Sequence, residues 1–288
     1  MSNWGKAHIN NNIGFGQAAL AGNGFGSVYD KSENGFTVLN YNFFTDATLA
    51  FSLRDLGLGA TYVVRVRRDS DNAEQDFTAN EITNGTLLSF VGSGNGFVTI
   101  LYEQKNSSLN LSNNTSTTQP KIVNNGTLVS ENGKPTILFD GNDDYLENDS
   151  ISITQPNQIF IVYSHGNNND NIAFDGRVIG ERQLINNKST GTTYYAGTQK
   201  SNNISPLFNQ LFLANLRFDA SNSFYKRNAI DLGLGNPGLQ NLNGLVLGAN
   251  ININADLNGF ISEFTIYDTI PQNENQIEQN ILNYYEIS

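Results

Sequence analysis

The densest cluster of charged side chains lies at residues 61–77, TYVVRVRRDSDNAEQDF. Its first half alternates as a strand does, with Tyr62, Val64 and Val66 on one face and Val63, Arg65 and Arg67 on the other. Interleaved guanidinium and carboxylate groups could bind a ligand or transfer protons. They can equally pair with one another, and we expect this structural role. Replacing Arg65 or Arg67 with Ala should then lower stability and leave ligand affinity unchanged.

A second acidic group, Asp140, Asp143 and Asp144, falls in a tight turn after the short strand 136–139. Carboxylates and turn carbonyls are oxygen ligands that suit calcium. Asp and Asn in tight turns also accept hydrogen bonds from their own backbone. We therefore expect no cofactor, and calcium stays open as an alternative.

The chain has two histidines, His8 and His165, and no cysteine. The lack of cysteine excludes disulfides, thiolate metal sites and cysteine nucleophiles. A Ser-His-Asp triad would have to use His165, at a strand end, where a surface histidine is the simpler interpretation.

Composition limits the classes of partner. Of the 288 residues 15% are charged, and the net charge is −11. This balance argues against nucleic-acid binding, which needs Lys and Arg to displace counterions from phosphates. No apolar run approaches the roughly 20 residues of a membrane span, and the first residues do not resemble a signal peptide.

Residues 1–45 differ from the rest of the chain. The phrases at 13–17 (IGFGQ) and 23–27 (NGFGS) form a near-repeat rich in glycine. Such a segment cannot build its own core, yet Trp4, Phe15, Phe25 and Tyr29 are too apolar for a solvated linker. The segment resembles N-terminal segments of bacteriophage virion proteins. It is therefore interpreted as an anchor into a virus particle and a site of homo-oligomerisation, with a trimer favoured; a flexible leader is the alternative.

Residues 46–288 are predicted to form one all-β domain, because many short strands alternate with Gly, Asn and Asp turns. We expect a two-sheet jelly-roll sandwich with a few short helices. The expected helices are one capped by Asp46, one at 81–91, and a C-terminal one capped by Asn273 with Ile277, Ile281, Leu282 and Tyr285 on one face. The expected strands lie at 62–67, 97–102, 136–139, 159–164, 177–180, 211–218, 224–227, 245–248 and 260–267.

Five phrases in order carry a family resemblance: residues 52–56, 64–77, 96–104, 119–123 and 132–146. The series is similar to the arabinofuranosidase-B-type, concanavalin A-like domains. That resemblance implies a jelly roll that binds sugars on its concave face.

The resemblance does not extend to the catalytic residues. Retaining glycosidases need two carboxylates about 5 Å apart. An ungapped match places Asn252 at the family's acid/base position, and no counterpart of the nucleophile is found between Gly180 and Leu216. Because an amide cannot transfer a proton as a carboxyl group does, we expect no catalytic residue. Glu263, on a strand face with Ile261, Thr265 and Tyr267, is expected to make a structural hydrogen bond.

The leading hypothesis is a non-enzymatic virion protein on the outer surface of a phage particle. It would contact other virion proteins through residues 1–45 and host-surface glycans through its sandwich. The predicted ligand-binding residues are Tyr194, Tyr195, Asn250, Asn252 and Asn254, since amides and aromatic faces suit neutral sugars. A glycosidase acting on host polysaccharide and a purely architectural decoration protein are the alternatives.

Overall fold

The computed structural model describes residues 25–32, 35–105, 107–166, 170–202, 207–254 and 257–288. Trp4 and Phe15 lie outside these ranges, as do the side chains of Phe25 and Tyr29, so the anchor contacts stay a prediction. Among the described residues, no helix is long and apolar enough to cross a membrane.

One sheet is built around β23 (Asn258–Tyr267), which pairs antiparallel with β14 (Asn157–His165) on one side. On its other side β23 pairs with β3 (Leu49–Ser52) and, further along, with β12 (Ile137–Asp140). Beyond β14 the sheet continues through β19 (Phe212–Phe218), β20 (Phe224–Arg227) and β21 (Ile230–Asp231). The strands predicted at 211–218 and 224–227 are thus confirmed, and they pair as a hairpin.

The second sheet is also antiparallel. Its strands in spatial order are β5 (Glu74–Phe77), β4 (Val64–Arg68), β6 (Gly96–Leu101), β7 (Leu111–Ser112), β13 (Leu146–Ile153), β22 (Leu242–Leu247), β15 (Asn171–Asp175), β16 (Leu184–Lys188), β17 (Gly191–Tyr195) and β18 (Gln199–Asn202).

Strand β8 (Lys121–Asn124) joins the two sheets, because it pairs with β6 on one side and with β12 on the other. It also pairs with β9 (Thr127–Leu128). A separate small hairpin consists of β10 (Ser130–Glu131) and β11 (Lys134–Pro135). Two single turns of 3₁₀ helix lie at Ser107–Leu109 and Ala220–Asn222.

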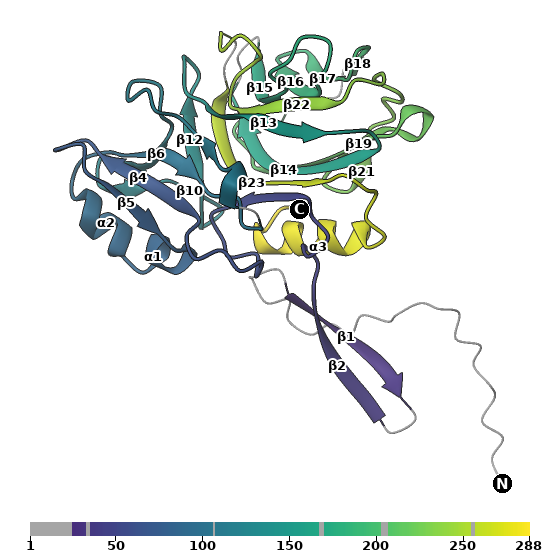
Figure 1. The fold of residues 1–288 in the computed structure, drawn as a ribbon, viewed down its shortest axis with the longest axis horizontal. Coiled ribbons are helices and arrows are strands. Elements are labelled where there is room, and N and C mark those ends of the chain that lie inside the picture. Colours follow the sequence, from purple (N-terminus) through teal and green to yellow (C-terminus); the bar gives the residue numbers. More distant parts are fainter. Residues whose placement is uncertain (1–24, 33–34, 106, 167–169, 203–206, 255–256) are drawn as a thin grey trace.

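The two sheets enclose the main hydrophobic core, to which both contribute side chains such as Ile159, Phe174 and Phe264. A smaller core fills the space between the outer face of β14 and β23 and the C-terminal helix α3 (Glu274–Tyr284). The all-β, two-sheet prediction is therefore confirmed (Figure 1).

The helices are shorter than predicted. Residues 81–91 form two helices, α1 (Ala79–Thr83) and α2 (Thr86–Val91), because Gly85 between them has a φ of 95°. The prediction of a helix capped by Asp46 is wrong: Leu49–Ser52 pairs with the central strand β23 as β3. Strand pairing in the core overrides the weak helical spacing of Leu49, Leu53 and Leu56.

The C-terminal helix was predicted correctly. It follows Asn273, and Ile277, Ile281, Leu282 and Tyr285 are buried beneath it. The Asn273 side chain, however, makes no capping hydrogen bond. The strand expected at 177–180 is instead a turn after β15, closed by a bridge between Val178 and Glu181.

Before the sandwich, β1 (Phe25–Ser32) and β2 (Gly35–Asn42) form an antiparallel hairpin that projects from the body (Figure 1). The residues directly after it belong to the sandwich. Phe43 and Phe44 are buried in the smaller core with α3, and Asn42 donates to the carbonyl oxygen of Leu56 at 2.7 Å. The packed unit therefore begins at Asn42, before the predicted boundary at residue 45.

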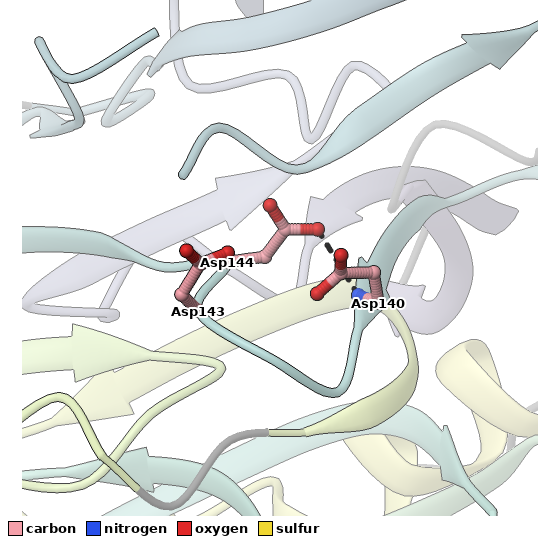
Figure 2. A group of neighbouring side chains, drawn as sticks. All are labelled: Asp140, Asp143 and Asp144. Atoms are coloured by element: carbon pink, nitrogen blue, oxygen red, sulfur yellow. Dashed lines mark hydrogen bonds between the residues drawn. The ribbon is translucent and has the colours of Figure 1, made fainter. Parts of the chain in front are cut away.

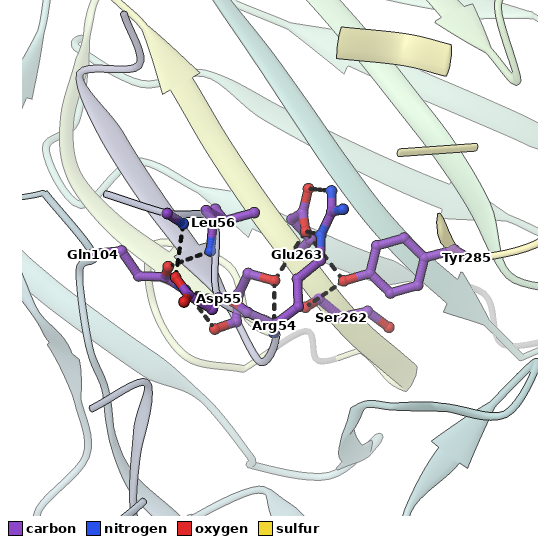
Figure 3. Close-up of polar contacts among 9 residues, drawn as sticks. Arg54, Asp55, Leu56, Gln104, Ser262, Glu263 and Tyr285 are labelled. Carbon is purple, nitrogen blue, oxygen red and sulfur yellow. Dashed lines mark hydrogen bonds and ion pairs between the residues drawn. The ribbon is translucent and has the colours of Figure 1, made fainter. Parts of the chain in front are cut away.

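A buried ion pair holds the two ends of the domain to the central strand. Arg54, which follows β3, donates two hydrogen bonds to Glu263 on β23, at 2.7 and 3.0 Å. The Glu263 carboxylate also accepts from the hydroxyl groups of Ser52 and of Tyr285, at 2.9 and 3.2 Å (Figure 3). The guanidinium lies 4.3 Å from the centre of the Tyr284 ring. The structural role expected for Glu263 is confirmed.

Glu263 points toward this network because of a β-bulge. The register between β14 and β23 shifts after Glu263, so that Tyr163 is opposite Ile261 and Ser262 is skipped. As a result Ile261 faces the main core while Glu263 and Tyr267 face α3. The prediction that Ile261 and Glu263 share a face is therefore wrong, since a bulge reverses the alternation.

We predict that Arg54→Ala lowers the free energy of unfolding by about 3–5 kcal/mol, because it leaves the Glu263 carboxylate buried and unpaired. The matched control is Arg65→Ala, which breaks an ion pair with Asp76 that solvent partly reaches. That change should cost about 0–1 kcal/mol. Urea unfolding of both variants measures the difference, and equal losses would contradict a special role for the buried pair.

Candidate functional site

A pocket of about 340 Å³ lies on the outer face of the second sheet, away from the main core. The side chains of alternate residues on β15, β16 and β17 form its floor, and the loop after β22 forms one wall. The described residues that line it are Ile172, Arg182, Leu184, Asn186, Lys188, Thr193, Tyr195, Gln199, Asn250, Ile251 and Asn252.

The two adjacent tyrosines face opposite ways. Tyr195 lines the pocket, whereas Tyr194 is fully buried in the main core, where its hydroxyl group donates to the carbonyl oxygen of Arg217. Successive residues of a strand point to opposite faces, so the pair cannot form one platform. The prediction of Tyr194 as a ligand-binding residue is wrong.

The predicted asparagines lie in the loop that forms the wall, and they differ in role. Asn250 accepts from the backbone nitrogens of Asn252 and Asn254, at 2.9 and 3.2 Å, and donates to the Asn254 side chain at 2.7 Å. Asn254 thus holds the loop without lining the pocket. Asn252 is exposed and lines it.

Glycine and a buried carboxylate fix this loop to the sheet. Gly248 has a φ of 84°, and a Cβ atom there would lie 2.2 Å from the Phe139 ring, so a larger residue would displace the loop. The backbone nitrogen of Ile251 donates to Asp175 at 3.0 Å, and Arg177 donates to the Ile251 carbonyl oxygen.

Asp175 also orients the arginine of the pocket. Arg182 donates to both of its carboxylate oxygens, and the guanidinium lies 5.7 Å from the centre of the Tyr195 ring. Burial raises the pKa of Asp175 to about 6, although Arg182 and the backbone of Ile251 act in the opposite direction. Asp175 is not among the described residues that line the pocket, whereas Arg182 is, so a ligand in the pocket would meet the guanidinium.

A second cation, Lys188, pairs with a carboxylate that is more exposed than Asp175. Asp170 contacts the Lys188 ammonium group at 3.2 Å and accepts from the Asn186 amide at 2.7 Å. Arg182, Asn186 and Lys188 were not among the predicted residues. On β16, Asn186 is opposite Thr193 and Lys188 is opposite Gly191. These residues lie on the same face of the sheet as Tyr195, so strand alternation starting from Tyr195 was the signal that could have identified them.

Donor groups dominate the pocket. It contains amides, a hydroxyl group, a guanidinium, an ammonium group and the Tyr195 ring, and no carboxylate belongs to the described lining. The arrangement can donate hydrogen bonds to hydroxyl or acidic oxygens of a ligand and stack against a ring face. The described lining does not offer the paired carboxylates that retaining glycoside hydrolysis uses.

The acidic group in the turn after β12 is brought together as expected. Ligand oxygens of Asp140, Asp143 and Asp144 lie within 4.8 Å of one another (Figure 2). Asp144 accepts from the Asp140 backbone nitrogen at 3.0 Å, and Asp140 accepts from the Asn142 backbone nitrogen at 2.9 Å. These hydrogen bonds within the turn are the structural role that was the alternative to calcium binding.

The charged stretch 61–77 is mostly self-paired, as predicted. Arg65 binds Asp76 and Arg68 binds Asp71. Arg67 departs from the prediction: it binds Gln119, Asn72 and the carbonyl oxygen of Ser116, and its guanidinium lies over the Phe97 ring.

His165 is buried rather than on the surface, so that expectation is wrong. It packs against the rings of Phe208 and Phe212, and its Nδ1 atom lies 3.0 Å from the Gly166 carbonyl oxygen. Burial lowers its pKa. His8 lies outside the described residues.

Taken together, the two antiparallel sheets form a β-sandwich whose fold is similar to that of solved arabinofuranosidases. No protein-family model matches the chain, and no curated protein matches it in sequence.

The fold of this chain is similar to that of solved enzymes. An arabinofuranosidase complexed with arabinofuranosyl-α-1,2-xylobiose superposes with a TM-score of 0.65 at 15% identity, over 83% of this chain and 63% of that one. A family-54 α-L-arabinofuranosidase soaked with a cyclic sulfate inhibitor gives 0.61 at the same identity and coverage. The chain thus spans 63% of the length of these enzymes, and the likeness establishes the fold alone.

The acidic turn generates a pH prediction. The pKa of Asp144 rises from an ordinary 3.8 to about 7, mainly through burial and then through Asp140 and Asp143. Between these two pH values the folded state keeps a proton that the unfolded state has released. The contribution of Asp144 to stability therefore falls as the pH rises from about 4 to about 7.

Asp144→Asn should remove that contribution, so its unfolding free energy should decline less over this pH range than that of the wild type. Denaturant unfolding at a series of pH values measures both slopes, with Asp46→Asn, at an exposed position outside this turn, as the control. Parallel slopes for wild type and Asp144→Asn would contradict the raised pKa. If the turn binds calcium, adding the ion at neutral pH would raise the wild-type Tm more than that of Asp144→Asn.

Proposed function

We propose that the chain is a non-enzymatic virion protein whose sandwich binds host-surface glycans in the pocket beside β16 and β17. The observation that carries the glycan part is the lining: a tyrosine ring and a set of fixed donors around a cavity that sugar-sized groups can enter. Such side chains recognise ring faces and hydroxyl oxygens together.

The likeness in fold supports the same class of ligand. The superposed arabinofuranosidase is complexed with arabinofuranosyl-α-1,2-xylobiose, which agrees with a glycan as the proposed ligand. At 15% identity, the sugar bound by this chain has to be inferred from its own pocket. Arg182 and Lys188 extend the proposed ligands beyond neutral sugars to sugars that carry acidic groups.

The virion part rests on residues 1–45. Their resemblance to phage virion segments agrees with a hairpin, β1–β2, that projects from the body and carries the chain away from the sandwich (Figure 1). A two-stranded hairpin is marginally stable alone in water, so a supporting partner or symmetry mates would stabilise it. We propose that this segment anchors the protein in the particle as a homotrimer.

Glycan binding is tested on an array of host-surface polysaccharides with the full chain. Tyr195→Ala should weaken binding about tenfold through loss of ring contact, and Asn252→Ala by a few-fold through loss of a hydrogen bond. Asn114→Ala, at an exposed position distant in sequence from the pocket, is the matched control. Undiminished binding of both pocket variants would place the site elsewhere, and no binding by the wild type would leave an architectural role.

The anchor is tested by comparing the mass in solution of the full chain with that of residues 42–288. This fragment keeps Phe43 and Phe44, which a fragment starting at residue 46 would remove from the core. We expect a trimer for the full chain and a monomer for the fragment, by light scattering after size exclusion. A monomeric full chain would contradict anchoring through self-association.

The glycosidase alternative makes a separate prediction. If it held, incubating the chain with host polysaccharide would release new reducing ends, which are measured directly. We expect none, because no carboxylate belongs to the described lining of the pocket and Asn252 stands at the expected acid/base position. Release of reducing ends by the wild type would overturn the non-enzymatic proposal.

A further inference from the structure

A second polar cluster lies on the opposite side of the molecule, where α3 covers the first sheet. Asn215 on β19 and Lys226 on β20 are direct cross-strand neighbours. Glu274 and Glu278, one turn apart on α3, point down between them. Neither the sequence prediction nor the proposed glycan site uses these residues.

The lysine and the asparagine share the same carboxylate oxygens. The Asn215 amide nitrogen donates to Glu278 Oε1 at 2.7 Å and to Glu274 Oε1 at 3.2 Å. The Lys226 ammonium group contacts Glu274 Oε1 directly and lies 3.8 Å from Glu278 Oε1. An amine and a carboxamide are therefore held side by side, with two carboxylates in common.

The other atoms around the carboxamide are arranged as an acyl-transfer reaction would need. Gln158, which is fully buried, donates to the Asn215 carbonyl oxygen at 2.7 Å. A fixed donor at that oxygen stabilises negative charge that develops on it. The leaving nitrogen, on the other side, already contacts Glu278, which can supply its proton.

We propose that Lys226 and Asn215 form an intramolecular isopeptide bond, with Glu278 as the proton-transfer group and Gln158 as the oxyanion donor. Lys226 first passes a proton to Glu278, and its neutral amine attacks the Asn215 Cγ atom. The new N–C bond forms while the carbonyl electron pair moves to Oδ1. The Cγ–Nδ2 bond then breaks, Glu278 protonates the leaving nitrogen, and Nζ returns a proton to Glu278. One amine and one primary amide give one secondary amide and one ammonia, without an oxidant or co-reactant.

Burial and charge favour this step. Asn215 and Glu278 are buried, and burial raises the pKa of Glu278, which helps it to hold a proton. Arg217 pairs with Glu274 and so neutralises the second carboxylate. The Phe224 ring lies 4.7 Å from the Lys226 ammonium group and shields one side of it from water.

A route for the product is also present. A pocket of about 520 Å³ opens beside the cluster, lined by Lys226, Phe224, Arg217 and the start of α3. Ammonia released at Asn215 can leave through it, which makes the reaction irreversible in dilute solution. A simple ion-pair network would hold Lys226 and the two glutamates without a covalent bond, so the two arrangements differ in covalent mass.

Mass spectrometry of the freshly purified, denatured full chain decides between them. We expect a mass lower than that of the sequence by one ammonia. Trypsin cleaves after Lys200, Arg217 and Arg227 but not after an acylated lysine, so the bond should yield one species that joins residues 201–217 to residues 218–227. An unmodified mass, with a free peptide 218–226, would overturn the proposal.

Two variants separate this bond from other losses of ammonia. Lys226→Arg keeps the positive charge but cannot form the bond, and Glu278→Gln keeps the shape but removes the proton carrier. Both should restore the sequence mass. Asn-Gly pairs such as Asn125–Gly126 can also lose ammonia by cyclising, and that loss would persist in Lys226→Arg. A deficit that persists there, or that maps outside the joined peptides, would contradict the proposal. The wild-type result stands even if a variant fails to fold.

Discussion

The fold depends on one costly arrangement, a charged pair enclosed between the central strand and its covering helix. Removing Arg54 and Glu263 from water is unfavourable unless every polar atom of the pair finds a partner. Here Ser52 and Tyr285 supply those partners, and they come from opposite ends of the domain. The pair therefore requires β3, β23 and the end of α3 to be in place together, which couples local elements into one cooperative unit.

Sequence alone predicted the fold class and most strands, because alternation and turn residues are local signals. It missed features that arise from contacts distant in sequence. The leucines near Asp46 have helical spacing, but Leu49 pairs with β23 across more than 200 residues. The bulge at Ser262 reverses the alternation that placed Ile261 beside Glu263, and no local residue marks it.

For the site, loop position indicated Asn252, which lines the pocket, and strand alternation should have separated Tyr195 from Tyr194. Arg182 and Lys188 were not predicted, although strand alternation from Tyr195 points to the face of β16 that carries Lys188. Their positions depend on Asp175 and Asp170, which lie far from the loop of Asn252 in the sequence, although Asp175 accepts a hydrogen bond from Ile251 of that loop.

The short segment after the projecting hairpin has a mechanical consequence. Phe43 and Phe44 are enclosed under α3, and the chain then enters β3, the neighbour of the central strand. A pulling force applied through the hairpin would act first on Phe43 and Phe44 and then on the hydrogen bonds between β3 and β23. Phe43 and Phe44 would therefore be the first part of the sandwich to resist a force applied through the hairpin.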